Sequence, residues 1–243
     1  MRLIVTAVLA TTIVIVLGFL TIIPMFYGSP EVEVKKQIML SFSILDSYNI
    51  VDWCKNVSSV LKTHNLGATV FIVGKVAEQN PECVTCFSER VDIGSRTFSN
   101  LNLTSLADYD AQLEEVTKGK IAVDTAGNLF SRVFKAPNQA TDQNIYSLLS
   151  LNGILADFSY DCQYNIYIDN QFMKFEAAVF EGASCSTDLL LALEPTPKLS
   201  ILHFESGYPT QLIEDLIISL ENGQFDFVNA SEVSGLDLTV RGV

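Results

Sequence analysis

Few side chains in this sequence could do chemistry, and the two histidines are the first to consider. A catalytic metal needs about three protein ligands, and histidine is the commonest of them. His64 precedes a strand expected at residues 68–73, whereas His203 ends a strand expected at 198–204. A strand of about 5–6 residues separates its two ends by ~17–20 Å. The two histidines therefore cannot share one metal ion.

Two cationic side chains follow expected strand ends. Arg96 comes after Gly94-Ser95, and Lys135 comes after a strand expected at 129–134. A guanidinium has no lone pair to give a metal, but it suits bidentate binding of a carboxylate or sulfate. We favour the alternative that Arg96 pairs with an acid such as Asp46 or Asp161, because a partly buried charge usually acquires a partner.

Aromatic residues near the same strand ends are candidate ligand contacts, since aromatic rings stack on sugars. Packing in the core is at least as common for such residues. The candidates are Phe98, Phe158 and Phe204. A nucleophile–base pair of Ser43 and His203 is a minor alternative, because nothing resembles a nucleophile elbow.

The five cysteines point to structural disulfides. We expect Cys162 to pair with Cys185, and Cys54 to pair with either Cys83 or Cys86, which leaves one thiol over. A redox pair or half a zinc site at Cys83-x-x-Cys86 is less favoured. Neither a second Cys-x-x-Cys nor a neighbouring histidine supports zinc.

The elements that position these side chains alternate between strand and helix. Strands are expected at 38–42, 68–73, 93–95, 129–134, 154–158, 198–204 and 225–228. Helices are expected at 49–63, 81–88, 141–151 and 210–220, with another from a cap at Thr104 or Ser105 to about residue 123. This order implies βαβ units and a parallel sheet. Seven strands suggest a closed or nearly closed α/β barrel, with function at the carboxyl ends of the strands. Residues 161–197 are the least regular part, and a tail is expected from residue 232.

The first residues indicate a membrane anchor. No charged residue occurs between positions 3 and 26. As a helix this run would reach about 36 Å, enough to cross a hydrocarbon core of about 30 Å. A cleaved signal peptide has a shorter apolar region and a small-residue cleavage site, so it is disfavoured. We expect an anchor over residues 1–27, a linker over 28–36 and one domain over 37–243.

Charge and sequons are consistent with an exported domain. The net charge of −13 repels nucleic acid and anionic lipid head groups. Sequons begin at Asn56, Asn102 and Asn229, which are candidate glycosylation sites. We expect the domain on the extracytoplasmic side of a cell membrane.

Five segments resemble, in order and spacing, the motifs of the polysaccharide deacetylase (NodB-homology) family. Residues 40–44 resemble its Thr-Phe-Asp-Asp motif, and residues 94–104 resemble the Gly-rich strand end that leads into His-Thr-x-Ser-His. Residues 134–138 resemble Phe-Arg-x-Pro-Tyr, residues 156–159 the fourth motif, and residues 201–204 Leu-Leu-His-Asp. The resemblance implies a deformed (β/α) barrel.

The resemblance also implies where a catalytic site would be and what it lacks. The family holds a divalent metal such as zinc with one Asp and two His. It uses a second Asp as base, an Arg to orient that base, and a His as acid. The matching positions here are Ser43 for the base, Ile44 for the metal aspartate, Arg96 and Asn100 for the histidines, Lys135 for the arginine and His203 for the acid. Only the acid is retained. For His203 we favour the alternative of a strand-end histidine kept for packing or a hydrogen bond, because a lone histidine lacks partners for catalysis. Asp46 is a nearby carboxylate that could replace a lost ligand.

We therefore expect no bound metal or other cofactor, and a non-catalytic role. The leading hypothesis is binding of a cell-surface polysaccharide or a structural role in the cell envelope. A divergent deacetylase that removes N-acetyl groups with relocated ligands is the second hypothesis. An accessory subunit of a membrane protein complex is the third.

Overall fold

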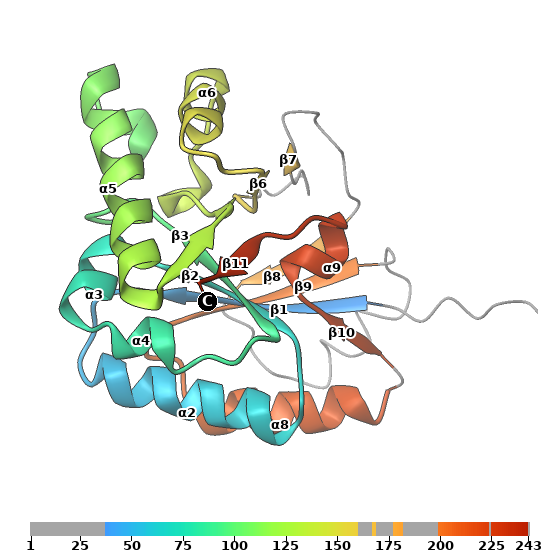
Figure 1. Ribbon diagram of the computed structural model, residues 1–243. Helices are drawn as coiled ribbons and strands as arrows, with labels where there is room; N and C mark the ends of the chain where they lie inside the picture. The colour runs from blue at the N-terminus through green and yellow to red at the C-terminus, as the bar shows by residue number, and fades with distance from the viewer. Residues whose placement is uncertain (1–36, 160–166, 169–176, 182–198, 224, 243) are drawn as a thin grey trace, which may run out of the picture. The chain divides into compact units, whose positions relative to one another are not determined.

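The computed structural model describes residues 37–159, 167–168, 177–181, 199–223 and 225–242 (Figure 1). The chain divides into two units, Met1–Val34 and Lys35–Val243, and every described residue belongs to the second. The expected anchor and linker lie outside the described residues, as do Asp161, Cys162 and Cys185. Among the helices that are described, none is both long and apolar enough to cross a membrane.

One sheet of nine strands organises the described part of the chain, in the order β7-β6-β5-β3-β2-β1-β9-β8, with β10 also paired to β1. The strands are β1 Gln37–Ile44, β2 Ala68–Ile72, β3 Val91–Ser95, β5 Val133–Phe134, β6 Ala156–Asp157, β7 Tyr167–Ile168, β8 Ala177–Glu181, β9 Leu199–Glu205 and β10 Asp226–Val228. All pairs are parallel except β6–β7. The expected deformed (β/α) barrel is confirmed as a curled sheet.

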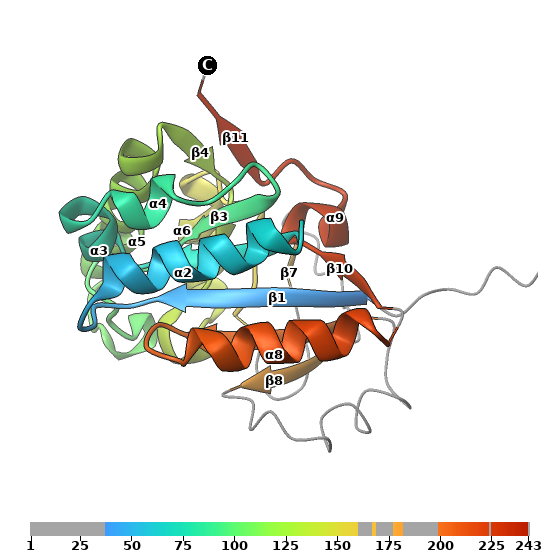
Figure 2. The same ribbon diagram turned by 90° about the horizontal axis from the view of Figure 1, so that it is seen from below.

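Helices pack around this sheet. They are α2 Ile50–Thr63, α3 Gly74–Gln79, α4 Glu82–Thr85, α5 Tyr109–Gly127, α6 Gln143–Leu151, α8 Thr210–Glu221 and α9 Ala230–Ser234. Figure 2 shows α2 and α8 side by side along β1. The apolar stripe of α2, which includes Trp53, Val57 and Leu61, packs with α8 residues in the same buried cluster.

Alternation along β1 divides the core in two. Leu40, Phe42 and Ile44 point outward into the cluster shared with the helices. Met39 points into the barrel, where it packs with a second cluster that includes Phe71. Successive strand residues face opposite sides, so Ser41 and Ser43 share the inner face with Met39.

An apolar cluster fills part of the barrel interior. Met39, Leu199 and Val228 pack there with Leu238, which enters from the segment before β11 (Thr239–Arg241). At Gly94 an added Cβ would lie 2.6 Å from the Phe71 ring, so glycine leaves the space that this ring fills.

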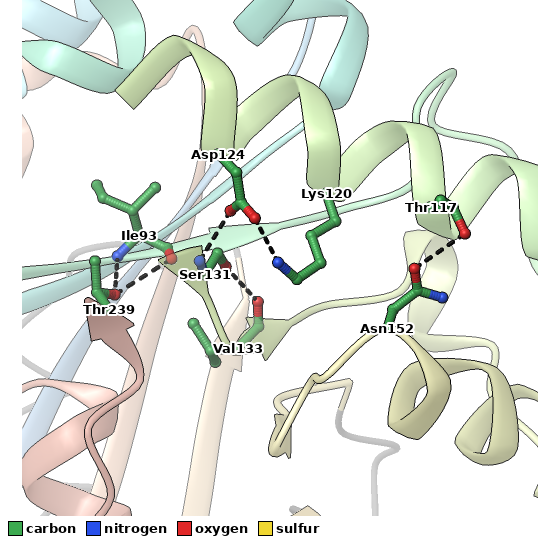
Figure 3. Close-up of polar contacts among 8 residues, drawn as sticks. All are labelled: Ile93, Thr117, Lys120, Asp124, Ser131, Val133, Asn152 and Thr239. Atoms are coloured by element: carbon green, nitrogen blue, oxygen red, sulfur yellow. Dashed lines mark hydrogen bonds and ion pairs between the residues drawn. The ribbon is translucent and has the colours of Figure 1, made fainter. Parts of the chain in front are cut away.

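Hydrogen bonds fasten the antiparallel pair of β4 (Leu129–Ser131) and β11 to α5 and β3. Figure 3 shows Asp124 accepting from the Ser131 N–H (2.8 Å) and from Lys120. In the same view the Thr239 hydroxyl accepts from the Ile93 N–H (2.9 Å) and donates to the Ile93 carbonyl. These contacts fix β3, the strand that leads to Arg96.

Several boundaries differ from the sequence-based expectation. The helix expected after Thr104 or Ser105 begins at Tyr109 with Asp108 as its cap, because the earlier residues form a 3-10 turn (Leu103–Ser105). The strand expected at 129–134 breaks at Arg132 into β4 and β5. Residues 161–197 contain β7 and β8, and the expected tail contains β11. Short or broken strands carry too few alternating residues to be recognised from sequence.

Candidate site at the carboxyl ends of the strands

Buried polar side chains gather where the parallel strands end. Register places Ser95 beside Phe134, and Phe134 beside Asp157, so β3, β5 and β6 end at one level. The next residues along the first two strands are Arg96 and Lys135, which are 3% and 2% exposed. Two cations are therefore buried at the same edge of the sheet. The buried polar side chains at this edge are Ser41, Ser43, Ser95, Arg96, Thr97, Lys135, Asp157, Ser159 and His203.

His203 is held by its neighbour on the adjacent strand. Its Nδ1 lies 2.9 Å from the hydroxyl oxygen of Ser41, its register partner on β1. Ser43 pairs in register with Glu205 instead, so the serine in contact with the histidine is not the one expected from the sequence. Burial lowers the pKa of His203 well below its usual value, and the positive charges of Lys135 and Arg96 lower it further. The imidazole is therefore neutral at pH 7 and has no acid proton to give to a leaving amine.

Asp157 lies at the end of β6 in the same layer. Its Oδ1 accepts hydrogen bonds from the backbone N–H (3.0 Å) and the hydroxyl of Ser159. The Ser159 oxygen also accepts from the Ala136 N–H, which ties the segment that carries Lys135 to β6. Burial raises the pKa of Asp157 to about 7, although the Ser159 hydrogen bonds and the Lys135 charge act in the opposite direction.

Backbone contacts fix the position of Arg96. Its N–H donates to the Ile72 carbonyl (2.9 Å), and the next carbonyl, that of Thr97, accepts from the Gly74 N–H (3.2 Å). Gly119 of α5 packs so closely that an added Cβ would lie 2.3 Å from the Arg96 carbonyl oxygen. Because backbone surrounds this position, the main chain at Arg96 cannot shift without moving α5.

The residues at the family's metal-binding positions do not fit a metal. The Ile44 side chain packs in the outer cluster with the helices, away from the inner face. Asn100 is exposed, in the left-handed region with φ of 58°, and Asp46 is also exposed. Within the described ranges, no three His, Cys, Asp or Glu side chains form a group that could hold an ion. Arg96 adds a fixed positive charge that opposes a cation.

Two of the three candidate aromatic contacts are core residues. Phe158 is fully buried against Phe71, with ring centroids 6.2 Å apart. Phe204 is fully buried and stacks on Phe42 at 5.6 Å. Phe98 is partly exposed, and its ring lies beside Gly74 at the start of α3 and lines a pocket with α5 residues such as Ile121. We did not choose Tyr48 as a candidate contact from the sequence, although it is 92% exposed in the loop that follows β1. Its position just beyond a strand end was the available signal.

The other candidate residues lie outside this site. His64 caps the far end of α2, where its Nδ1 lies 2.9 Å from a Glu221 carboxylate oxygen of α8. The structure thus places His64 and His203 in different parts of the fold, as expected. Among the sequon residues, Asn56 is exposed, Asn102 accepts from the Thr104 N–H, and Asn229 donates to the Arg90 carbonyl.

Comparisons with known proteins agree with the resemblance found in the sequence motifs. The sequence model of the polysaccharide deacetylase family matches residues 32–156. The fold is similar to a peptidoglycan deacetylase from Bacillus subtilis, at 15% identity over 83% of this chain and 91% of that chain, with a TM-score of 0.60. No curated protein matches the sequence significantly.

Another similar structure is a pseudoenzyme of carbohydrate esterase family 4 from Bacillus anthracis. It is 15% identical over 82% of this chain and 65% of that chain, with a TM-score of 0.58. A mutant of that pseudoenzyme, described as having restored enzymatic activity, matches at 14% identity over 82% of this chain and 67% of that chain, with a TM-score of 0.62. At such identities these likenesses concern the fold.

Proposed function

The chain belongs to the polysaccharide deacetylase family, and from this premise we propose that it is a catalytically degenerate member that binds a polysaccharide at the carboxyl ends of its strands. We propose that it holds no catalytic metal. It acts in the cell envelope, anchored by residues 1–27 with its domain on the extracytoplasmic side.

The residues at two of the family's metal-binding positions support this proposal best. They are Ile44, which is buried in the outer core, and Arg96, which is buried beside the strand ends. Metal-assisted hydrolysis needs an ion to polarise the carbonyl and to lower the pKa of its bound water. A guanidinium cannot coordinate a water molecule and lower its pKa as a metal ion does, but it can donate hydrogen bonds to oxygen atoms of a ligand. Loss of hydrolysis with retention of recognition is therefore the role that these residues support best.

Phe98 is the side chain best suited to meet a sugar. It is partly exposed, and it lies in the segment that follows Arg96. An aromatic ring in this position can cover the apolar face of a pyranose.

Binding can be tested with the full-length chain in a mild detergent, using peptidoglycan sacculi and chitin as probes. We expect co-sedimentation with one of them, and Phe98→Ala should weaken it about tenfold, which corresponds to about 1.4 kcal/mol. Phe130→Ala is the matched control, since Phe130 is 46% exposed on β4, ahead of the amino end of β5. Equal retention of both variants would mean that ligands bind elsewhere.

Metal content provides a second, independent test. After exposure to zinc and desalting, elemental mass spectrometry should find far less than one ion per chain, because the described residues offer no ligand set. About one ion per chain that is lost in Asp46→Ala would contradict this expectation.

Metal-dependent acetate release from acetylated sugars, lost in His203→Ala, would favour the divergent deacetylase. Co-purification of one fixed membrane protein, without glycan binding, would favour the accessory subunit.

A further inference from the structure

Three of the five cysteines lie together on the outer side of the sheet. Cys54 is on α2, Cys83 is on α4, and Cys86 follows the last residue of α4. The first two are fully buried, whereas Cys86 is partly exposed. The sulfur atoms of Cys54 and Cys83 face each other at 2.6 Å.

We propose that Cys54 and Cys83 form a disulfide that joins α4 to α2, and that Cys86 stays outside this bond as a thiol. A disulfide requires the two sulfur atoms to meet, and those of Cys54 and Cys83 already lie 2.6 Å apart across the α2–α4 contact. The proposal chooses between the two partners of Cys54 that the sequence left open. It does not depend on the proposed function.

The bond forms by loss of two protons and two electrons from the two thiols. The electrons pass to a disulfide-carrying oxidant such as oxidised glutathione, whose own S–S bond is cleaved to two thiols. The attacking species is a thiolate. The hydrogen bond to Cys83 and burial hold the pKa of Cys54 well above its usual value, so Cys54 supplies little thiolate in the folded chain. Both side chains are fully buried and closed to an oxidant, so oxidation should accompany folding, before α4 closes on α2.

Cys86 is poorly placed to displace this bond. Burial raises the pKa of its thiol to about 11, and the neighbouring Cys83 also raises it. Little thiolate is therefore present at neutral pH to attack the disulfide. The backbone of Cys86 contributes to the same contact. Its carbonyl accepts hydrogen bonds from the Ser58 hydroxyl (2.6 Å) and the Lys62 ammonium (2.9 Å) of α2. The disulfide and these hydrogen bonds thus hold both ends of α4 against α2, just ahead of β3.

Peptide mapping tests the pairing directly. The full-length chain is refolded in a mixture of reduced and oxidised glutathione, alkylated with iodoacetamide and digested with trypsin. Cleavage yields peptide 37–55, which contains Cys54, and peptide 76–90, which contains Cys83 and Cys86. We expect the two peptides to be linked, with the alkyl group on Cys86. The link should persist in Cys86→Ser and disappear in Cys83→Ser.

Thermal unfolding provides a second readout, which does not depend on peptide mapping. Reduction should lower the Tm of the wild type by roughly 6–12 °C more than it lowers the Tm of Cys83→Ser, and Cys86→Ser should behave like the wild type. If Cys83→Ser fails to fold, the alkylation pattern of the wild type decides alone. Unlinked peptides, or a link that survives Cys83→Ser and vanishes in Cys86→Ser, would overturn the proposal.

Discussion

Replacing Ile44 by aspartate should leave the chain largely unfolded at neutral pH. The family's metal aspartate corresponds to this position, so the substitution is an obvious step toward restoring activity. In this chain, however, the side chain is fully buried in the apolar cluster between β1 and the helices. The change removes a buried aliphatic side chain, which costs about 2–5 kcal/mol, and adds an unpaired carboxylate that costs several more. The sum is comparable to the whole stability of a domain, about 5–15 kcal/mol.

Two variants separate the buried charge from other causes. Ile44→Val keeps the site apolar and should cost only about 1 kcal/mol. Ser43→Asp introduces the same carboxylate one residue earlier, on the inner face, at the edge where Arg96 and Lys135 are buried. It should cost much less than Ile44→Asp, because cations at that edge favour a carboxylate. Urea unfolding at pH 7 measures all three. Equal stability of the two aspartate variants would mean that residue 44 can turn inward, and would reopen the question of relocated ligands.

The outward position of Ile44 could be predicted from the pattern of residue types in β1, although the motif comparison did not indicate it. Residues 40–44 alternate, with Leu40, Phe42 and Ile44 apolar and serines between them. That period of two already placed Ile44 on the face opposite Ser43, whatever the motif match implied about its role. The alternation of strands and helices likewise predicted the barrel, and the strand-end position of His203 predicted its place at the site.

Other features of the site could not be predicted from the sequence, because they depend on register or depth. The contact of His203 with Ser41 joins residues 162 positions apart and follows from the pairing of β9 with β1. Phe158 and Phe204 both end strands and look alike in the sequence, yet one packs inside the barrel and the other outside it. The raised pKa of Asp157 follows from its complete burial, which no local pattern indicates.

Asp157→Asn should become progressively more stabilising, relative to the wild type, as the pH rises from about 4 to about 7. Burial raises the pKa of Asp157 from 3.8 to about 7, so the folded state prefers the protonated acid. Below pH 3.8 the acid is protonated in both states. Between the two pKa values the folded chain binds more protons than the unfolded chain, and the wild type loses stability with rising pH. Above about pH 7 the loss is complete.

The size of the effect follows from the two pKa values. Between about pH 5 and about pH 8.5, the difference in unfolding free energy between Asp157→Asn and the wild type should change by about 3 kcal/mol. The lowered pKa of His203 acts in the opposite sense, since that residue costs stability as the pH falls below 6.5. Both proteins contain His203, so its contribution cancels in the difference. Asparagine can still accept the two hydrogen bonds from Ser159, which keeps the local geometry comparable.

Urea unfolding of both proteins across this pH range provides the measurement. A difference that does not vary with pH would mean that Lys135 stabilises an ionised Asp157 fully, as a buried ion pair. In that case His203 would face a site with one more negative charge, and its imidazole would be protonated more readily. The acid role in amide hydrolysis would then regain a chemical basis. The curve for Asp157 therefore decides, together with the metal content, between a site that only binds and one that retains part of a catalytic apparatus.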